Sequence, residues 1–301
     1  DLTPPGRQPL TIDIDNFSTR LELLEGFSEE YGRWNLQGET MLDRNGSKSA
    51  TIEAHNVART ADFLRLAFAS GPDGELMGST LEARAHEGEG GSLAGALGYS
   101  PDRPFDLDVR INSQAFDALV TSGDDQPVQA RGRFDETGGQ GGGFIRFAGS
   151  SLLEPLIARL GPQLQFGIGV RPVQGREGEY AIGVRTRADN LTLAVRGVVS
   201  KEGTAGEDGL QVQASTPSLS RLAGQDIARA AQVDGTFRSQ GSQWSFNGRA
   251  GFEQASMAGY SLRRLGGPIE IDARDGQYEF EGDFSGEGGT GDGLLASLIG
   301  S

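Results

Sequence analysis

The side chains of this chain that could carry out catalysis or bind a metal ion are few and lie far apart. His55 and His86 are the two histidines, and their separation fits no metal-ligand spacing. The absence of cysteine excludes disulfides, thiolate zinc sites and cysteine nucleophiles. The GxSxG, GxxxxGK(S/T) and HExxH motifs are also absent. We therefore expect no metal site, no cofactor and no enzymatic activity.

Two near-matches to ligand-binding motifs lie close to the end of the sequence. Residues 291–296 fit G-x-G-x-x-A, but Asp292 places a carboxylate where a pyrophosphate would sit, and no parallel βαβ unit follows. Residues 288–294 approach a calcium-binding nonapeptide, with Asp292 one position early and no repeat. Glu279 and Glu281 lie two apart, hence on one face of a strand, where they favour solubility rather than acid–base chemistry.

The elements that would position these residues are strands. The segment 268–284, PIEIDARDGQYEFEGDF, illustrates the pattern, because apolar and acidic residues alternate on both sides of a turn. Asp275 and Gly276 favour a two-residue hairpin turn. Such a turn sets apolar pairs on one face and acidic pairs on the other, and like charges placed opposite one another repel, so the acidic face must lie in water. The expected pairs are Ala273–Tyr278, Ile271–Phe280, Asp272–Glu279 and Glu270–Glu281.

One-sided alternation of this kind recurs along most of the chain, and short turn segments such as 206–209 separate the runs. Tight turns predict antiparallel meanders, because parallel crossovers need a dozen or more residues. The glycine-rich stretch 134–144 is either a flexible loop or the wide end of a hairpin. The inward parity of the strands around residues 50–98 is left open by the pattern. The candidate apolar-face residues are Leu107, Val109, Ile111, Leu164, Phe166, Ile168, Val170, Tyr180, Ile182, Val184, Leu191, Leu193, Val195, Trp244, Phe246, Ile269, Ile271, Tyr278 and Phe280.

Helical segments are few and short. Residues 151–161 have Ser151 and Glu154 in capping-box spacing, Pro155 in the first turn, and a stop at Gly161. Residues 292–300 repeat the LLxxLI pattern of that segment, and weaker candidates lie at 218–232 and 113–120. The repeated LLxxLI predicts two β modules, residues 1–161 and 162–301, each closed by a short helix; chance similarity between leucine-rich helices is the alternative.

The composition is acidic and rich in glycine. The 301 residues carry a net charge of −15, and the 27 basic residues are scattered, so no nucleic-acid footprint is expected. Glycine makes up 47 of the 301 residues, well above the usual ~7%, and the glycines do not follow the three-residue period of collagen. No apolar run reaches 18 residues, so no membrane-spanning helix is expected. The start at Asp1, without a signal segment, indicates a fragment or processed product whose anchor would lie elsewhere.

The apolar face of so many strands must be covered. Leaving large apolar side chains in water costs about 1.5 to 3 kcal/mol each, and a domain is stable by only about 5 to 15 kcal/mol. A few short helices cannot cover the sheet, so it must curl on itself or bind an apolar guest. Gly167 and Gly169, on the polar parity, would ease bending. Periodicity alone does not separate a lipid-filled trough from a closed sandwich.

Long phrases of the sequence resemble the central region of the TamB proteins of alphaproteobacteria, members of the AsmA-like group of bridge-like lipid transfer proteins. The phrases are LGPQLQFGIGVRP, YAIGVRTRADNLTLAVRG, SLSRLAGQDIARAAQVDGTFR and SMAGYSLRRLGGPIEIDARDGQYEFEGDFSGEGGTGDGLLASLIG, with looser similarity in GRWNLQGETMLDRNG and GYSPDRPFDLDVRI. The resemblance covers most of the chain and rests on phrase order, with no catalytic motif.

The resemblance implies a mostly β protein with an elongated, curled antiparallel sheet, the β-taco, and a few short amphipathic helices. Its apolar groove would carry phospholipid acyl chains through the periplasm between the inner and outer membranes, with support of outer-membrane protein assembly as a further role. An inner-membrane anchor and a domain that engages the outer-membrane partner TamA would lie outside this segment. The alternative is a structural or scaffolding β-sandwich or solenoid with a closed core and no lipid channel.

Overall fold

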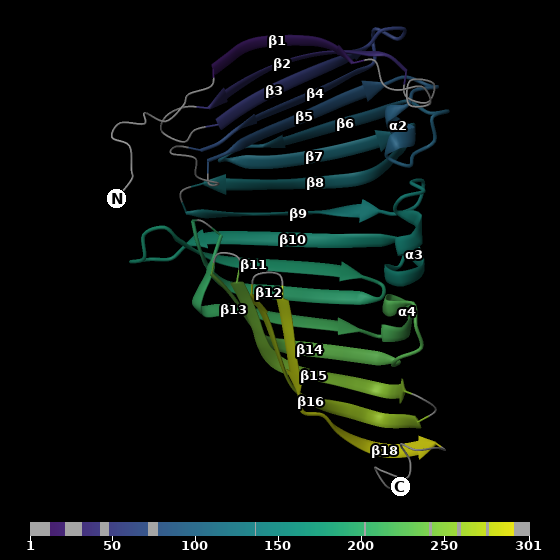
Figure 1. Ribbon diagram of the computed structural model, residues 1–301, viewed down its shortest axis with the longest axis vertical. Helices are drawn as coiled ribbons and strands as arrows, with labels where there is room; N and C mark the ends of the chain where they lie inside the picture. Colours follow the sequence, from purple (N-terminus) through teal and green to yellow (C-terminus); the bar gives the residue numbers. More distant parts are fainter. Residues whose placement is uncertain are drawn as a thin grey trace, which may run out of the picture. The chain divides into compact units, whose positions relative to one another are not determined.

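The computed structural model describes residues 13–21, 32–42, 48–71, 78–135, 137–201, 203–240, 243–257, 260–274 and 277–291. These residues form 18 antiparallel strands of one sheet and three short helices (Figure 1). The expectation of a mostly β chain, with a curled antiparallel sheet and only a few short helices, is confirmed.

The chain divides into two compact units. Unit 1 comprises Asp1–Asp135 and Gly149–Leu152, and unit 2 comprises Glu136–Ala148 and Leu153–Ser301. The predicted modules, residues 1–161 and 162–301, rest on the second LLxxLI segment, which lies outside the described residues. That division therefore stays a prediction.

Unit 1 is a meander in which each strand pairs with the next along the chain. Its helix α2, Leu93–Ala96, lies between β5 and β6. The carboxylate of Glu87 accepts hydrogen bonds from the N–H groups of Leu93 and Ala94, and so satisfies the start of this short helix. The strands are β1 Asp13–Leu21, β2 Trp34–Leu42, β3 Lys48–Asn56, β4 Phe63–Ala69, β5 Thr80–Glu87, β6 Phe105–Ile111, β7 Ala115–Ser122 and β8 Asp125–Asp135.

Unit 2 continues the meander pattern from β9 to β16 and then divides. The second half of β16 pairs with β17, whereas its first half pairs with β18. The two halves meet at Gly266 and Gly267. The strands are β9 Gly138–Arg146, β10 Gln163–Pro172, β11 Glu179–Ala188, β12 Leu191–Ser200, β13 Ala205–Thr216, β14 Ala230–Gln240, β15 Gln243–Met257, β16 Tyr260–Arg274, β17 Gln277–Gly282 and β18 Ser285–Gly291; the helices are α3 Glu154–Leu160 and α4 Leu219–Ala223.

The hairpin expected at residues 268–284 is present as β16 and β17. Every predicted cross-strand pair is observed, which confirms the register; its turn residues, Asp275 and Gly276, lie outside the described residues. The glycine-rich stretch 134–144 is largely strand, because β9 begins at Gly138.

The helix expected at 151–161 is confirmed in part. α3 has Pro155 in its first turn and ends at Gly161, as predicted. The capping box is wrong, because Leu153 occupies the N-cap position without a side-chain hydrogen bond. The candidate at 218–232 is shortened to α4, which Ser218 caps and Gly224, at φ 73°, terminates. The candidate at 292–300 lies outside the described residues.

Two local predictions are wrong. Residues 113–120 are not helical but contribute most of β7, because the Asn112 side chain accepts hydrogen bonds from the N–H groups of Gln114 and Ala115 and turns the chain into a hairpin. The segment 206–209 is not a turn but lies within β13, where the β12–β13 register shifts beyond Gly197. Gly209, at φ 64°, supplies the backbone conformation that this irregularity needs.

The buried side chain of Asn190 links the two helices of unit 2 to the turn between β11 and β12. The amide of Asn190, in the turn between β11 and β12, donates to the carbonyl oxygens of Arg159 and Ser218, at 2.8 and 2.9 Å. Its oxygen accepts from the Thr216 hydroxyl. The guanidinium of Arg221 on α4 donates to carbonyls of α3, including that of Ile157 at 3.0 Å. These bonds satisfy the last carbonyls of α3 and tie α3 to α4.

One face of unit 1 is mainly apolar and the other is mainly charged. Tyr99 and Phe105 are buried under α2 in a small core with Val120, and their rings lie 5.5 Å apart. The opposite face carries charges of alternating sign in ion pairs. Arginine and carboxylate are 2.8 Å apart in Arg84–Glu82, 2.6 Å in Arg110–Asp108 and 2.9 Å in Arg131–Asp117.

Candidate functional site

Cross-strand register places the predicted apolar residues of unit 2 on one face of the sheet. Ile168 lies opposite Val184, and Val184 lies opposite Val195. The row continues through β13 and β14 to β15, and a neighbouring row runs from Phe246 to Ile271 and Phe280. Residues directly opposite in an antiparallel pair share a face. The predicted residues that share this face are Leu164, Phe166, Ile168, Val170, Tyr180, Ile182, Val184, Leu191, Leu193, Val195, Trp244, Phe246, Ile269, Ile271, Tyr278 and Phe280.

The predicted residues of unit 1 also share one face. Leu107, Val109 and Ile111 on β6 lie opposite Val120, Ala118 and Phe116 on β7, respectively. The parity that the sequence left open around residues 50–98 is decided by the register. The apolar face of β3, β4 and β5 consists of Ala50, Ile52, Ala54, Leu64, Leu66, Phe68, Leu81, Ala83 and Ala85.

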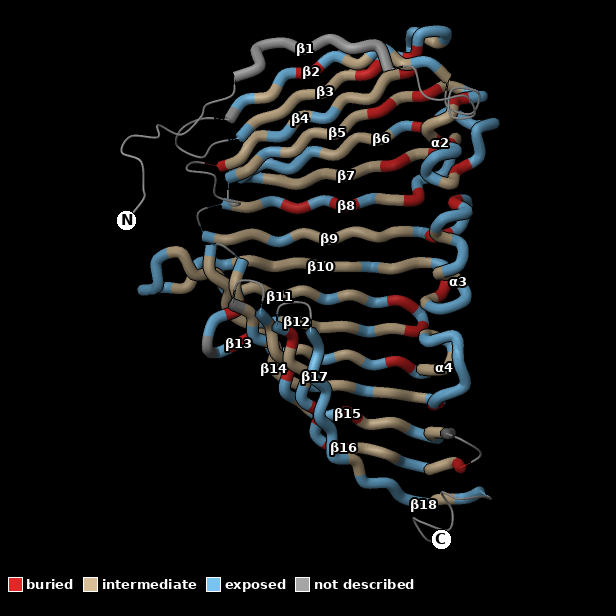
Figure 2. Tube along the Cα trace, viewed as in Figure 1, coloured by how far each residue is buried: buried red, intermediate tan, exposed pale blue. Residues whose placement is uncertain are grey.

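The described residues leave the apolar face of β10, β11 and β12 incompletely covered. All of its predicted residues, from Leu164 to Val195, are half-buried rather than buried. Figure 2 shows these strands tan and pale blue along most of their length. On β17, the side chains of Tyr278 and Phe280 are 74% and 64% exposed. Within the described residues, the molecule therefore presents large apolar side chains without a matching protein surface.

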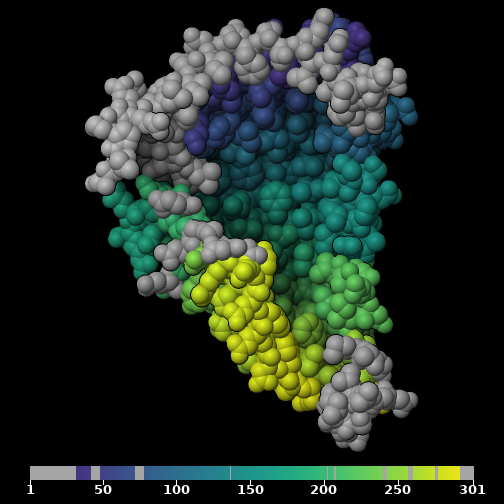
Figure 3. Space-filling model, in the orientation of Figure 1, coloured from purple at the N-terminus to yellow at the C-terminus, as the bar shows by residue number. Residues whose placement is uncertain are grey.

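Unit 2 curls so that this apolar face lies on the inside. The Trp244 ring lies 5.7 Å from Phe237 and 6.2 Å from Tyr278, which brings β14, β15 and β17 around one aromatic group. Phe246 and Ile269, each 8% exposed, pack with Ala250 at the bottom of the curl. In the space-filling view the surface of unit 2 is hollowed between the yellow β17 and the green segment that carries α4 (Figure 3). An apolar groove therefore lies within unit 2.

Two glycines of unit 2 lie where the neighbouring strand leaves no room for a side chain. Gly235 and Gly248 lie opposite one another on the apolar face. A Cβ added to Gly235 would lie 2.5 Å from the Asn247 oxygen and 2.6 Å from the Phe246 ring, and one on Gly248 would collide with the Asp234 oxygen. By contrast, a Cβ on Gly167 or Gly169 would meet nothing closer than 3.7 Å. We call this close approach of β14 and β15 at Gly235 and Gly248 the crease; that Gly167 and Gly169 ease bending stays a prediction.

Several groove residues were not predicted. Val212, Val233, Phe237, Phe252 and Phe284 pack against the core of unit 2. Phe237 and Phe252 belong to the runs DGTFRS and AGFEQ, where small residues interrupt the alternation. Their parity becomes visible only when β14 and β15 are aligned, because Phe237 lies opposite Phe246 and Phe252 opposite Leu265.

The two histidines lie on the charged face of unit 1. His55 and His86 flank Phe63 across β3, β4 and β5, with ring centroids 6.2 and 6.3 Å from the Phe63 ring. His86 Nδ1 lies 2.6 Å from Asp106 Oδ1. The part of the chain that the structure describes contains no group of His, Cys, Asp and Glu that could hold a metal ion. The pKa of Tyr99 is raised by burial.

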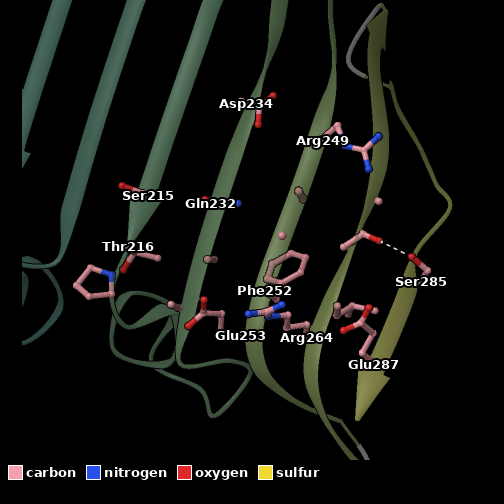
Figure 4. Close-up of a pocket in the computed structure, with 18 residues that line it drawn as sticks. Ser215, Thr216, Gln232, Asp234, Arg249, Phe252, Glu253, Arg264, Ser285 and Glu287 are labelled. Carbon is pink, nitrogen blue, oxygen red and sulfur yellow. Dashed lines mark hydrogen bonds between the residues drawn. The ribbon is translucent and has the colours of Figure 1, made fainter. Parts of the chain in front are cut away.

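A second, polar hollow lies over β13 to β16 and β18 of unit 2, with a volume of about 780 Å³ (Figure 4). Acid and base alternate across its strands, since Asp234 lies opposite Arg249 and Glu253 lies opposite Arg264. The Ser285 hydroxyl donates to the Gly266 carbonyl oxygen rather than to a base. This arrangement provides charge for solubility and no activated nucleophile.

Comparison of the chain with family models, curated proteins and solved structures found no match. Among the residues with described structure, no helix is long and apolar enough to cross a membrane.

Proposed function

We propose that the apolar groove of this chain binds the acyl chains of phospholipids and forms part of a conduit through which they move. The observation that carries the proposal is the half-buried apolar face of β10, β11 and β12, which the apolar face of β13 to β17 continues. Each large side chain on this face lacks part of the ~1.5 to 3 kcal/mol that full burial contributes. An acyl chain laid across the strands supplies the missing contacts.

The chemistry of the groove suits movement as well as binding. The side chains on this face of β10, β11 and β12 include Ile168, Val184 and Val195, which offer dispersion contacts and no strong hydrogen-bonding group. Apolar attraction is non-directional, so an acyl chain exchanges one contact for an equivalent one as it slides. Bound headgroups stay in water at the open side of the groove.

The biological setting follows from the resemblance to TamB proteins. The chain is a periplasmic, non-enzymatic segment of a protein anchored in the inner membrane, and it moves phospholipid toward the outer membrane. A TamA-like outer-membrane protein is engaged through other regions of the protein, with support of outer-membrane protein assembly as an accompanying role.

The alternative function is a scaffold whose apolar faces only pack together. It is favoured by the cluster of Phe246, Ala250 and Ile269, which forms an ordinary closed core at the base of the curl. The half-buried face of β10, β11 and β12 favours the conduit over the scaffold.

Native mass spectrometry of the chain purified from bacteria tests the proposal. We expect a mass shift equal to one or more phospholipids that disappears on delipidation. A chain that never carries lipid, with these apolar faces shielded from solvent, would instead establish the scaffold.

Photocrosslinking provides a matched control within one strand. A photoreactive phenylalanine analogue at Val184, on the apolar face, should crosslink to phospholipid. The same analogue at the adjacent Arg185, on the opposite face, should not. Equal crosslinking at both positions would contradict a groove on the apolar face.

Polar substitutions separate binding from folding. Ile168→Asn with Ile182→Asn places amides on the half-buried face and should abolish lipid retention while the chain stays folded. Phe246→Ala removes a buried ring and should cost about 3 to 5 kcal/mol of unfolding free energy. Urea unfolding and lipid content are measured on both variants. If the Ile168 and Ile182 variant unfolds as readily as Phe246→Ala, this face is a packed core.

A further inference from the structure

On the polar face of β10, β11 and β12, four arginines have no ion-pair partner among the residues that the structure describes. Arg171, Arg185, Arg187 and Arg196, on β10, β11 and β12, are exposed, and the described residues provide none of them with an ion pair or hydrogen bond. Their cross-strand neighbours are small or neutral: Arg185 lies between Gly167 and Ala194, Arg187 between Gln165 and Thr192, and Arg196 between Gly183 and Gln211; Arg171 lies opposite Ala181. We call these four residues the arginine surface.

The arginine surface differs from the polar face of unit 1. There several arginines lie within 4 Å of carboxylates on their own or neighbouring strands, as in Arg65–Glu53 and Arg131–Asp117, although Arg133 is exposed without an ion pair to a described residue. The arginine surface instead contributes to a hollow of about 1320 Å³, whose lining also includes Gly167, Gly169 and apolar residues of the same strands such as Ile168 and Val184. Glycine and alanine neighbours leave the guanidinium groups accessible from outside.

A complementary acidic surface lies on the same unit. Glu270 and Asp272 on β16 lie opposite Glu281 and Glu279 on β17, so that four carboxylates face one another in pairs. Their one basic contact in the described structure is the 4.0 Å approach of Arg274 to Asp272. We call these four residues the acidic surface. Like charges placed opposite one another destabilise a strand pair, so both surfaces gain from a partner of opposite charge.

The spacing of the two surfaces matches. Arg185 and Arg187 are two residues apart on one strand, and so are Glu279 and Glu281, which sets both pairs about 6.8 Å apart. Arg196 on β12 lies opposite Gly183, diagonal to Arg185, whereas Glu270 on β16 lies directly opposite Glu281, so the match is limited to the two pairs. A guanidinium binds a carboxylate through two parallel hydrogen bonds, so Arg185 and Arg187 can each bind one of Glu279 and Glu281 when the acidic surface lies on the arginine surface.

We propose that the arginine surface of one molecule docks the acidic surface of a second copy of this chain. The contact is head-to-tail, because each copy contributes a different surface, and it leaves one free surface at each end for further copies. It uses the face opposite the apolar groove, so the inference goes beyond the proposed function and does not depend on lipid binding.

Sedimentation velocity of the 301-residue chain over a range of concentrations tests the proposal. We expect concentration-dependent association in the wild type. The variant Arg185→Glu with Arg187→Glu and the variant Glu279→Arg with Glu281→Arg should each lose it, with affinity weakened by more than about tenfold. Mixing the two variants should restore association, because the arginine surface left intact in one variant can bind the acidic surface left intact in the other, and the two reversed surfaces are also complementary. Circular dichroism confirms that both variants fold.

A matched control changes the charge by the same amount elsewhere. Arg110→Glu with Arg131→Glu, on the polar face of unit 1, should associate like the wild type. The neutral pair Arg185→Gln with Arg187→Gln should weaken association less than the reversed pair. A wild type that stays monomeric at every concentration, reversed variants that associate unchanged, or a mixture that stays monomeric would each overturn the proposal.

Discussion

Single glycines allow β14 and β15 of unit 2 to approach each other closely. At Gly235 and Gly248 the backbones of β14 and β15 approach so closely that the Phe246 ring fills the space a Cβ would need. At Gly183 on β11 a Cβ would meet nothing within 4 Å. The crease therefore depends on the absence of a side chain at particular positions rather than on the overall glycine content.

Alanine substitution separates these two kinds of glycine. Gly235→Ala or Gly248→Ala should lower the unfolding free energy by more than about 2 kcal/mol, because the added methyl group collides with backbone atoms of the neighbouring strand. Gly183→Ala should leave the unfolding free energy unchanged or raise it by about 0.4 to 1 kcal/mol, because alanine gives the unfolded chain less conformational freedom than glycine. Urea unfolding measures both effects. Equal effects at all three positions would contradict a crease at Gly235 and Gly248.

Burial of one tyrosine makes the stability of unit 1 sensitive to alkaline pH. Desolvation raises the pKa of Tyr99 above its ordinary value of 10.0. A group whose pKa is raised by folding stabilises the fold fully below its unfolded pKa, and this contribution is lost as pH rises through the folded pKa. The unfolding free energy should therefore fall above about pH 10, and Tyr99→Phe should reduce that fall. Urea unfolding from about pH 8 to 11 checks it. Identical pH profiles would show that Tyr99 does not contribute.

At the scale of elements, the positions of α3 and α4 in unit 2 depend on contacts with the turn between β11 and β12. α3 and α4 are short, with seven and five residues, so their own hydrogen bonds contribute little stability. Asn190 bonds to both of their segments, and Arg221 joins them. The edge of the groove near α4 is therefore held by polar contacts with the β11–β12 turn.

Removing the Asn190 amide should loosen this edge. Asn190 is 1% exposed, so Asn190→Ala leaves two carbonyl oxygens and the Thr216 hydroxyl without their partner and should cost about 1 to 3 kcal/mol of unfolding free energy. Asn112→Ala is the control, because Asn112 is exposed and its backbone partners can bond to water. Hydrogen exchange should increase in α3 and α4 only for Asn190→Ala. Unchanged exchange there would contradict the role given to Asn190.

At the scale of the molecule, each unit joins an apolar face to a charged one, and the apolar faces are incompletely covered. A ligand that binds only the folded state raises stability in proportion to the logarithm of its concentration. If acyl chains fill the groove, lipid content and stability must rise and fall together.

Delipidation should therefore lower the melting temperature of the chain, and titration with a short-chain phospholipid below its micellar concentration should raise it again. The matching glycerophospho headgroup without acyl chains should have no effect, because the groove offers apolar contacts. Differential scanning calorimetry measures the shifts. A melting temperature that does not change on delipidation or on titration with the phospholipid would contradict lipid binding in the groove.

The sequence by itself determined the strands and their faces. Alternation along the chain is a local property, so the register of β16 with β17 and the apolar parity of β10 to β12 followed from it. Prediction from alternation failed where local signals conflict. Residues 113–120 also have the spacing of a helix, but the turn at Asn112 directs the chain into strand β7.

Only the tertiary structure decided how much of the apolar face is covered. Phe246 and Ile182 have the same parity and similar hydrophobicity, yet Phe246 is buried in the crease and Ile182 is half-buried. The difference arises because Ala250 and Ile269 pack with Phe246, and apolar residues of neighbouring strands such as Phe237 pack against this cluster. Alternation reports which side a residue faces; burial depends on what the opposite strands bring to that side.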